Sequence, residues 1–163
     1  MTQTSLPLPL ITKSSLDLLS DQARSSPRLR KNFNFHASNE AACHRLLNAL
    51  EPGTYIQPHR HLGAEKDETM VLVRGRFGVL IFNEEGGVQQ QFVLGAQEGI
   101  YGVTIPLGCF HSMVALESGS VFFESKAGPY TPITAEEKAS WAPSEGDAAC
   151  ADYLEKMRAY FPA

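Results

Sequence analysis

Short apolar runs that alternate with turn residues constrain this chain more than any other feature. Between residues 44 and 104 each run is only a few residues long, and Gly, Pro or Asn separates it from the next. Strands at short regular intervals with turn signals between them are typical of an antiparallel sandwich or barrel. The segment 83–87, which ends in two glycines, predicts a hairpin loop. The expected strands cover residues 45–50, 69–73, 77–82, 88–94, 111–116 and 120–125.

Two amphipathic helices are expected beside these strands. Apolar side chains at helical spacing predict a short helix at 15–25, which Pro27 ends. A second helix is predicted at 148–161, and its apolar face would pack against the barrel or a partner subunit. We therefore expect one mainly β domain with an N-terminal helix and covering segment at 13–36, a barrel core at 44–126, and loops with a C-terminal helix at 127–163.

Composition narrows the classes of function. The chain has 163 residues, enough for one domain with its own core, and its net charge of −4 argues against nucleic acid as a partner. No uninterrupted apolar run approaches the ~20 residues that span a membrane. The three cysteines form no C-x-x-C pair, and the N-terminus lacks an early cation and is broken by Pro7 and Pro9. These features favour a reducing cytoplasm over secretion.

Two of the five histidines, His59 and His61, are separated by a single residue. Side chains alternate in an extended strand, so both imidazoles would face the same side and could reach one metal ion. Tyr55 and Gln57 share this parity, which makes them candidates for a catalytic role in the same cavity. An inward aromatic ring at Tyr55 that merely fills the barrel is the alternative.

An acidic residue at the start of a predicted strand supplies a further candidate ligand. Glu68 shares a face with Met70 and Leu72, so it points into the barrel if they do. A buried carboxylate without a partner is costly, whereas one bound to a metal is satisfied. Glu65 is the competing carboxylate, although it is expected in an exposed loop, and Glu68 is preferred because its position on the strand sets its direction.

The third histidine follows a predicted tight turn. Pro106 and Gly108 form the turn, and His111 opens the next strand on the same face as apolar residues. With His59, His61 and Glu68, it would complete a site for one divalent metal ion. Cys109 beside it is expected to pack in the core, with soft ligation of the metal as the alternative.

Cations, amides and aromatics are mixed in the segment 28–36, which is expected to be a loop or an edge strand. Its polar side chains could line the mouth of the barrel, where an anionic sugar or carboxylate would dock. The alternative is a covering strand whose cations are solvated. The substrate-binding candidates are Arg28, Arg30, Asn34 and His36.

The motifs described above resemble the two sequence motifs of the cupin superfamily. They run Gly53-x5-His59-x-His61, then Glu68-x6-Gly75, then Pro106-x-Gly108-x2-His111. The resemblance implies a small antiparallel double-stranded β-helix, or jelly-roll barrel, in which three histidines and one glutamate hold a metal. The gap from His61 to Glu68 is longer than in most cupins. Glu65 would fit that gap but would break the spacing to Gly75. Ala115 stands where many cupins have an asparagine.

A narrower resemblance covers most of the chain. The runs at 26–36, 45–50, 58–61 and 128–130 are similar to the WbuC family of cupin-fold metalloproteins, found in bacteria. Some members are encoded beside genes for surface polysaccharide, which implies a sugar derivative as a possible substrate class.

The sequence leaves three functions open. The first is an enzyme that uses a divalent ion as a Lewis acid for isomerase, epimerase or lyase chemistry on a small polar substrate. The second is a non-catalytic module that binds or senses a sugar or other small molecule, and the third is an iron-dependent dioxygenase. The ligand set accepts zinc, nickel, iron or manganese. A homodimer is expected because small barrels expose sheet edges that a partner can cover.

Overall fold

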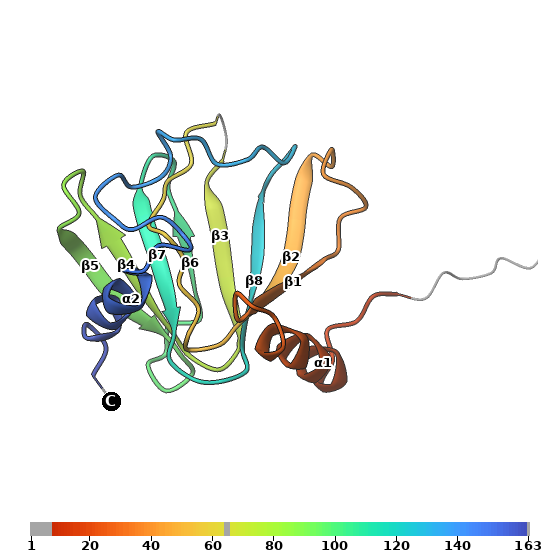
Figure 1. Ribbon diagram of the computed structural model, residues 1–163. Helices are drawn as coiled ribbons and strands as arrows, with labels where there is room; N and C mark the ends of the chain where they lie inside the picture. The colour runs from red at the N-terminus through yellow and green to blue at the C-terminus, as the bar shows by residue number, and fades with distance from the viewer. Residues whose placement is uncertain (1–7, 64–65, 163) are drawn as a thin grey trace, which may run out of the picture.

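Eight strands and two helices make up the computed structural model, which describes residues 8–63 and 66–162. The strands form a five-stranded sheet in the order β1-β2-β8-β3-β6 and a three-stranded sheet in the order β5-β4-β7, with every described pairing antiparallel (Figure 1). The strands are β1 (Arg30–Asn34), β2 (Cys43–Leu50), β3 (Glu68–Arg74), β4 (Phe77–Phe82), β5 (Val88–Leu94), β6 (Gly102–Ile105), β7 (Phe110–Ala115) and β8 (Ser120–Ala127).

The two sheets enclose an apolar core. Phe77 from β4 packs edge-on against Phe122 from β8, with their ring centroids 5.2 Å apart. Other buried side chains of both sheets join this cluster, among them Leu50, Met70 and Met113. Alternation along β3 explains which residues point inward, because Glu68 and Met70 are buried while Val71 is exposed. The fold is the predicted small antiparallel cupin barrel.

Helix α1 (Lys13–Arg24) covers the outer face of the five-stranded sheet. Its first turn is closed by a capping box between Thr12 and Ser15, and its apolar stripe packs on Leu47 and Val121. The Arg74 guanidinium lies 2.6 Å from both the Asp17 carboxylate and the Ser20 hydroxyl of this helix. The arginine therefore anchors the helix to the barrel, a contact between segments far apart in sequence.

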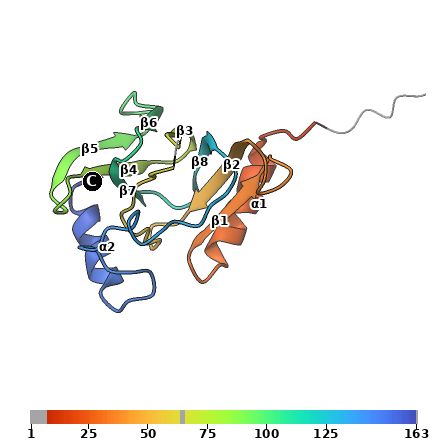
Figure 2. The same cartoon turned by 90° about the horizontal axis from the view of Figure 1, so that it is seen from above.

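Helix α2 (Cys150–Arg158) is shorter than the predicted 148–161 and lies beside β4 and β7, at the opposite end of the molecule from α1 (Figures 1 and 2). Leu154 and Met157 are buried in a second apolar cluster with residues such as Leu80 and Val114. The apolar face of α2 thus packs against the barrel, one of the two expected roles.

The middle of the segment 28–36 forms an edge strand, because β1 pairs with β2 from Arg30↔Leu50 to Asn34↔Leu46. The hairpin between β4 and β5 is also as predicted, since the Asn83 and Gly87 backbones are hydrogen-bonded. In the described part of the chain, neither helix has the length and apolar character needed to cross a membrane.

Candidate metal centre

His111 and Glu68 come from facing sheets. His111 is the second residue of β7 and lies opposite Ile81 of β4. Glu68 opens β3, where it pairs with Ile105 on one side and Lys126 on the other. Both side chains are buried. The predicted strand positions therefore direct an imidazole and a carboxylate into the same interior space.

His59 and His61 lie on a segment that was expected to be a regular strand. The described residues 51–63 contain no strand, and His59 forms only isolated bridges to His111 and Lys138. Two backbone hydrogen bonds join His59 to His111, with N···O distances of 3.0 and 2.8 Å. The segment is nevertheless extended enough that the rings of His59 and His61 lie together, with centroids 5.3 Å apart.

Hydrogen bonds to Glu137, near the C-terminus, hold this histidine segment in place. We call this residue the brace. The buried Glu137 carboxylate accepts hydrogen bonds from the backbone N–H groups of Leu62 and Thr134, at 2.9 and 2.8 Å. The backbone N–H of Arg60 donates to the Glu137 carbonyl at 2.8 Å. Because Glu137 holds both its own loop and residues beside His61, the ligand segment has a fixed position without belonging to a sheet.

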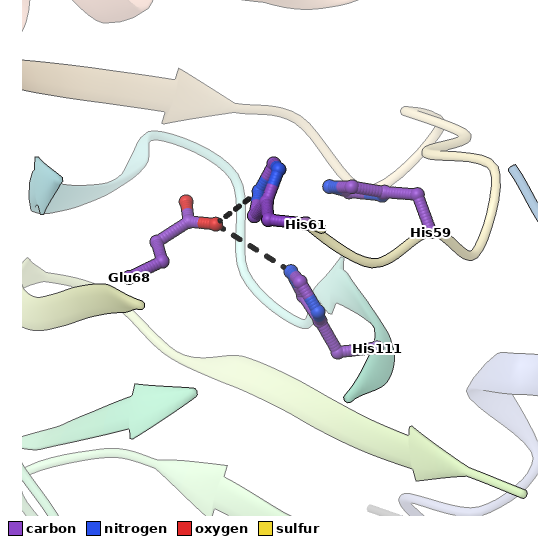
Figure 3. A group of neighbouring side chains, drawn as sticks. All are labelled: His59, His61, Glu68 and His111. Atoms are coloured by element: carbon purple, nitrogen blue, oxygen red, sulfur yellow. Dashed lines mark hydrogen bonds and ion pairs between the residues drawn. The ribbon is translucent and has the colours of Figure 1, made fainter. Parts of the chain in front are cut away.

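The four side chains converge on one point (Figure 3). One potential ligand atom from each of His59, His61, Glu68 and His111 can be chosen so that all four lie within 4.8 Å of one another. The Glu68 Oε2 atom is 2.9 Å from His61 Nε2 and 3.5 Å from His111 Nε2. The ring centroids of His59 and His111 are 4.6 Å apart. This spacing could hold one metal ion.

The hydrogen bonds of two imidazoles fit that role. His59 Nδ1 lies 2.9 Å from the Gln57 carbonyl oxygen, and His111 Nδ1 lies 3.0 Å from the Cys109 carbonyl oxygen. A carbonyl only accepts, so each Nδ1 donates its proton and each Nε2 keeps a lone pair for the cluster. Backbone carbonyls that fix the ring in this way are characteristic of histidines that bind metals.

The protonation states also suit metal binding. Burial and, to a lesser extent, the neighbouring His111 lower the pKa of His59 to about 3, so the ring is neutral near pH 7. Burial alone would raise the pKa of Glu68, but the nearby His111 and His61 and the charge of Lys126 hold it well below its usual range. A neutral imidazole and an ionised carboxylate are the forms that bind a divalent cation.

The cluster opens on a cavity of about 820 Å³ between the five-stranded sheet and the loops that follow β8. His59, Glu68 and His111 contribute to its wall, and apolar side chains such as Ile56 and Met113 form another part. A cavity of this size can enclose a small organic molecule. The arrangement therefore places a candidate metal centre against a space that could hold a substrate.

Three further polar residues of the wall were missed by sequence reasoning. Asn48 on β2 and Glu124 and Lys126 on β8 line the cavity beside Glu68. Burial and the Glu68 charge, partly offset by Lys126, raise the pKa of Glu124 to about 7. Alternation along β8 could have revealed them, because Glu124 and Lys126 share a face with Phe122, a core residue.

The two residues predicted to be catalytic lie in different places. Gln57 lines the cavity, and its side-chain amide donates to the Ala139 carbonyl at 3.2 Å. Tyr55 instead belongs to the apolar cluster under α2, where its hydroxyl donates to the Pro143 carbonyl at 2.7 Å. The equal-parity prediction is wrong for Tyr55, because side chains in an irregular segment do not alternate strictly.

Two of the four predicted substrate-binding residues lie in the cavity wall. Arg28 and Arg30 each donate from Nη2 to the Glu145 carboxylate at 2.6 Å, at the edge of the cavity. Among the described residues of the wall, neither Asn34 nor His36 occurs. His36 is buried and stacks on His44, with ring centroids 4.1 Å apart.

The remaining alternatives concern Cys109 and Glu65. Cys109 is partly buried and packs on the barrel core, as expected, and burial raises the pKa of its thiol. Glu65, the competing carboxylate, lies outside the described residues.

Comparison with known proteins gives a family and several distant structural likenesses. A family described as "Domain of unknown function (DUF6016)" matches residues 11–94, just over half of the chain. No curated protein matches the sequence. KdgF from Halomonas sp. is 18% identical, with a TM-score of 0.49 over 65% of this chain and 84% of that one.

Two other solved structures show similar or weaker likenesses. A conserved protein of unknown function, SPY1581 from Streptococcus pyogenes, is 14% identical, with a TM-score of 0.48 over 65% of this chain and 80% of that one. Oxalate decarboxylase OxdC from Bacillus subtilis is 24% identical, with a TM-score of 0.39 over 55% of this chain and 22% of that one.

Proposed function

The chain belongs to the DUF6016 family, and we propose that it is a metal-dependent enzyme that acts on a small polar substrate. One observation carries the proposal: four potential ligand atoms lie within 4.8 Å of one another, and three of their four residues line a cavity of about 820 Å³. A structural ion needs no such space, whereas an ion that binds a substrate does. His59, His61, Glu68 and His111 would hold the metal.

A divalent ion bound there would supply Lewis-acid polarisation of a carbonyl or hydroxyl oxygen, which suits isomerase, epimerase or lyase chemistry. The chain itself contributes position and exclusion of water. The carbonyls of Gln57 and Cys109 fix two imidazoles, and Glu68 is held by His61 and His111. Apolar side chains such as Met70 and Phe122 reduce the access of water to the inner wall.

The arginine pair at the cavity edge supports an anionic group on the substrate. Arg28 and Arg30 together bind both oxygens of the Glu145 carboxylate. A paired-guanidinium site of this geometry also suits a carboxylate or phosphate from outside the chain. A sugar derivative of the kind implied by the resemblance to the WbuC family, with a link to surface polysaccharide, would combine such a group with hydroxyls.

A binding or sensing module is the second candidate. The same cavity could hold a sugar or metabolite while the ion only orients it, and a closed coordination shell would favour this function. Iron at the site would instead permit dioxygen chemistry, because open positions beside histidine and carboxylate ligands are what that chemistry requires. The identity of the native metal separates these possibilities.

We also propose a homodimer. Strands β1 and β6 form the two edges of the five-stranded sheet, and unpaired edges favour association with a second chain.

Elemental analysis of the purified protein tests the metal centre. We expect about one divalent ion per chain, and its loss in His59→Ala and His111→Ala, because each variant removes one of four ligands. His36→Gln is the matched control, since His36 lies outside the cluster, and it should keep the metal. Full occupancy in either alanine variant would contradict the proposed site.

Water exchange distinguishes the enzyme from the module. We expect protein loaded with Mn²⁺ to increase the relaxation rate of solvent water protons above that of the metal-free protein, because an open position on the ion holds an exchanging water. A protein that binds Mn²⁺ without this increase would have a closed coordination shell around the ion. That result would contradict the proposed enzyme and favour the binding module.

A further inference from the structure

A group of polar side chains on the inner wall of the barrel borders the metal centre but supplies none of its candidate ligands. Asn48 Nδ2 donates to Glu124 Oε2 at 2.8 Å, and Lys126 Nζ lies 2.5 Å from Glu124 Oε1. Glu124 is only 6% exposed. Glu124 and Lys126 lie on the same face of β8 as Phe122 of the apolar core, and Asn48 is opposite Phe122 on β2. We call Asn48, Glu124 and Lys126 the polar wall.

Packing does not explain the polar wall. Moving a carboxylate and an ammonium out of water costs free energy, and their mutual attraction in the interior roughly offsets this cost. Apolar side chains of similar volume would fill the same space and would often leave the fold equally stable. Buried polar groups without a gain in stability are most often part of a functional site.

The polar wall adjoins the metal centre. Lys126 Nζ lies 3.8 Å from Glu68 Oε1, and Lys126 is opposite Glu68 in the register of β8 and β3. Asn48, Glu124 and Lys126 line the same cavity as His59, Glu68 and His111. A molecule in this cavity that reaches Glu68 can therefore also reach Lys126.

The unused hydrogen-bonding capacity of the wall indicates what it would bind. An ammonium has three N–H donors, of which the short contact with Glu124 occupies one. Among the described residues, the Asn48 side chain makes one hydrogen bond, through one N–H, which leaves its other N–H and its carbonyl oxygen for a ligand. Donors and acceptors thus lie side by side within one small area.

Hydroxyl groups match this pattern, because each of them both donates and accepts. A carboxylate or phosphate would match it poorly, since it only accepts and would face the carboxylates of Glu124 and Glu68. We propose that Asn48, Glu124 and Lys126 form a subsite for neighbouring hydroxyl groups of a sugar or other polyol. The assignment rests on the proposed function in taking this cavity as the substrate chamber.

Saturation-transfer NMR of the purified full-length protein with D-xylose and D-sorbitol tests the subsite. We expect both probes to give signals with the wild type. In the double variant Glu124→Leu/Lys126→Met, the Kd of each should rise about tenfold or more, because hydrogen bonds to charged groups are lost. Both charges are removed together and Glu68 keeps its contacts with His61 and His111, so the thermal midpoint should change little.

A matched control makes the same two substitutions elsewhere. Glu155→Leu/Lys156→Met changes an exposed glutamate and an exposed lysine of α2, and it should leave the Kd of both probes unchanged. If the first double variant does not fold, Glu124→Gln/Lys126→Met replaces it, because the amide can still accept the bond from Asn48. An unchanged Kd in a folded variant, or the absence of a signal with either probe in the wild type, would overturn the subsite.

Metal analysis of the same samples separates this proposal from the proposed function. The polar-wall variant should keep its metal, because all four candidate ligands remain. Sugar binding by a wild type that takes up no metal would remove the proposed enzyme and leave the subsite standing. Metal uptake by a wild type that binds neither probe would do the reverse.

Discussion

Glu68 and His111 are carried by regular strands, whereas His59 and His61 lie on a segment held mainly by single contacts. The strand residues are fixed by ladder pairing on both sides, as in the pairing of Glu68 with Ile105 and Lys126. The loop residues depend on a bridge to His111 and on the Glu137 carboxylate. We refer to these as the strand half and the loop half of the centre. The candidate site thus combines a rigid half with one whose position is set by few bonds.

Acid should affect the loop half most strongly through His59. In the metal-free protein its pKa is about 3, below the ordinary 6.5, so between these values the unfolded chain takes up a proton that the folded chain does not. The contribution of neutral His59 to the free energy of unfolding is therefore complete above pH 6.5 and is lost as the pH falls. Compared with His59→Gln, we expect the wild type to lose about 2 kcal/mol more between pH 6.5 and 4.5.

Urea unfolding of both metal-free proteins at several pH values measures this difference. The comparison with the variant is needed because Glu124 changes the stability with pH in the opposite direction to His59. Its raised pKa, about 7, gives stability that is present at low pH and lost as the pH rises. Parallel stability curves for the wild type and His59→Gln would show that His59 is not held in its neutral form by the fold.

Removal of the brace should weaken the loop half without touching a ligand. In Glu137→Ala the backbone N–H groups of Leu62 and Thr134 lose their acceptor. We expect the Kd for Zn²⁺ to rise about 10- to 100-fold, as for other residues that orient metal ligands. Competition with a chromophoric chelator gives the value. Glu136→Ala, an exposed neighbour, is the control and should not change it, and an equal Kd in Glu137→Ala would contradict the brace.

The smallest expected effect concerns the contact between Arg60 and β7. The guanidinium lies over the Phe110 ring, 4.4 Å from its centroid, and joins the loop half to the strand half. In Arg60→Ala we expect the free energy of unfolding to fall by about 0.5–1 kcal/mol, measured by urea denaturation. Arg60 also pairs with the exposed Glu84, so Glu84→Ala should lower the free energy of unfolding by less than Arg60→Ala does. An equal loss in both variants would assign the effect to the ion pair.

The same comparison explains what could be predicted from the sequence. Period-two alternation and turn residues located the strands and gave the direction of Glu68, because register in a sheet fixes both. The convergence of three histidines followed from motif spacing. Tyr55 was misplaced because parity fails where the backbone leaves the sheet. The contact of Arg74 with α1 and the brace from Glu137 join residues distant in the chain, which local patterns do not encode.

Glu137 is synthesised after all four candidate metal ligands, and this order affects when the site can form. A ribosome releases the chain from its N-terminus, so every strand and all four candidate ligands emerge before residues 134–139. The barrel can begin to pair at that stage, but Leu62 has no acceptor until Glu137 has left the exit tunnel. We therefore expect the metal affinity of the nascent chain to rise once Glu137 has emerged and can accept the hydrogen bond from Leu62.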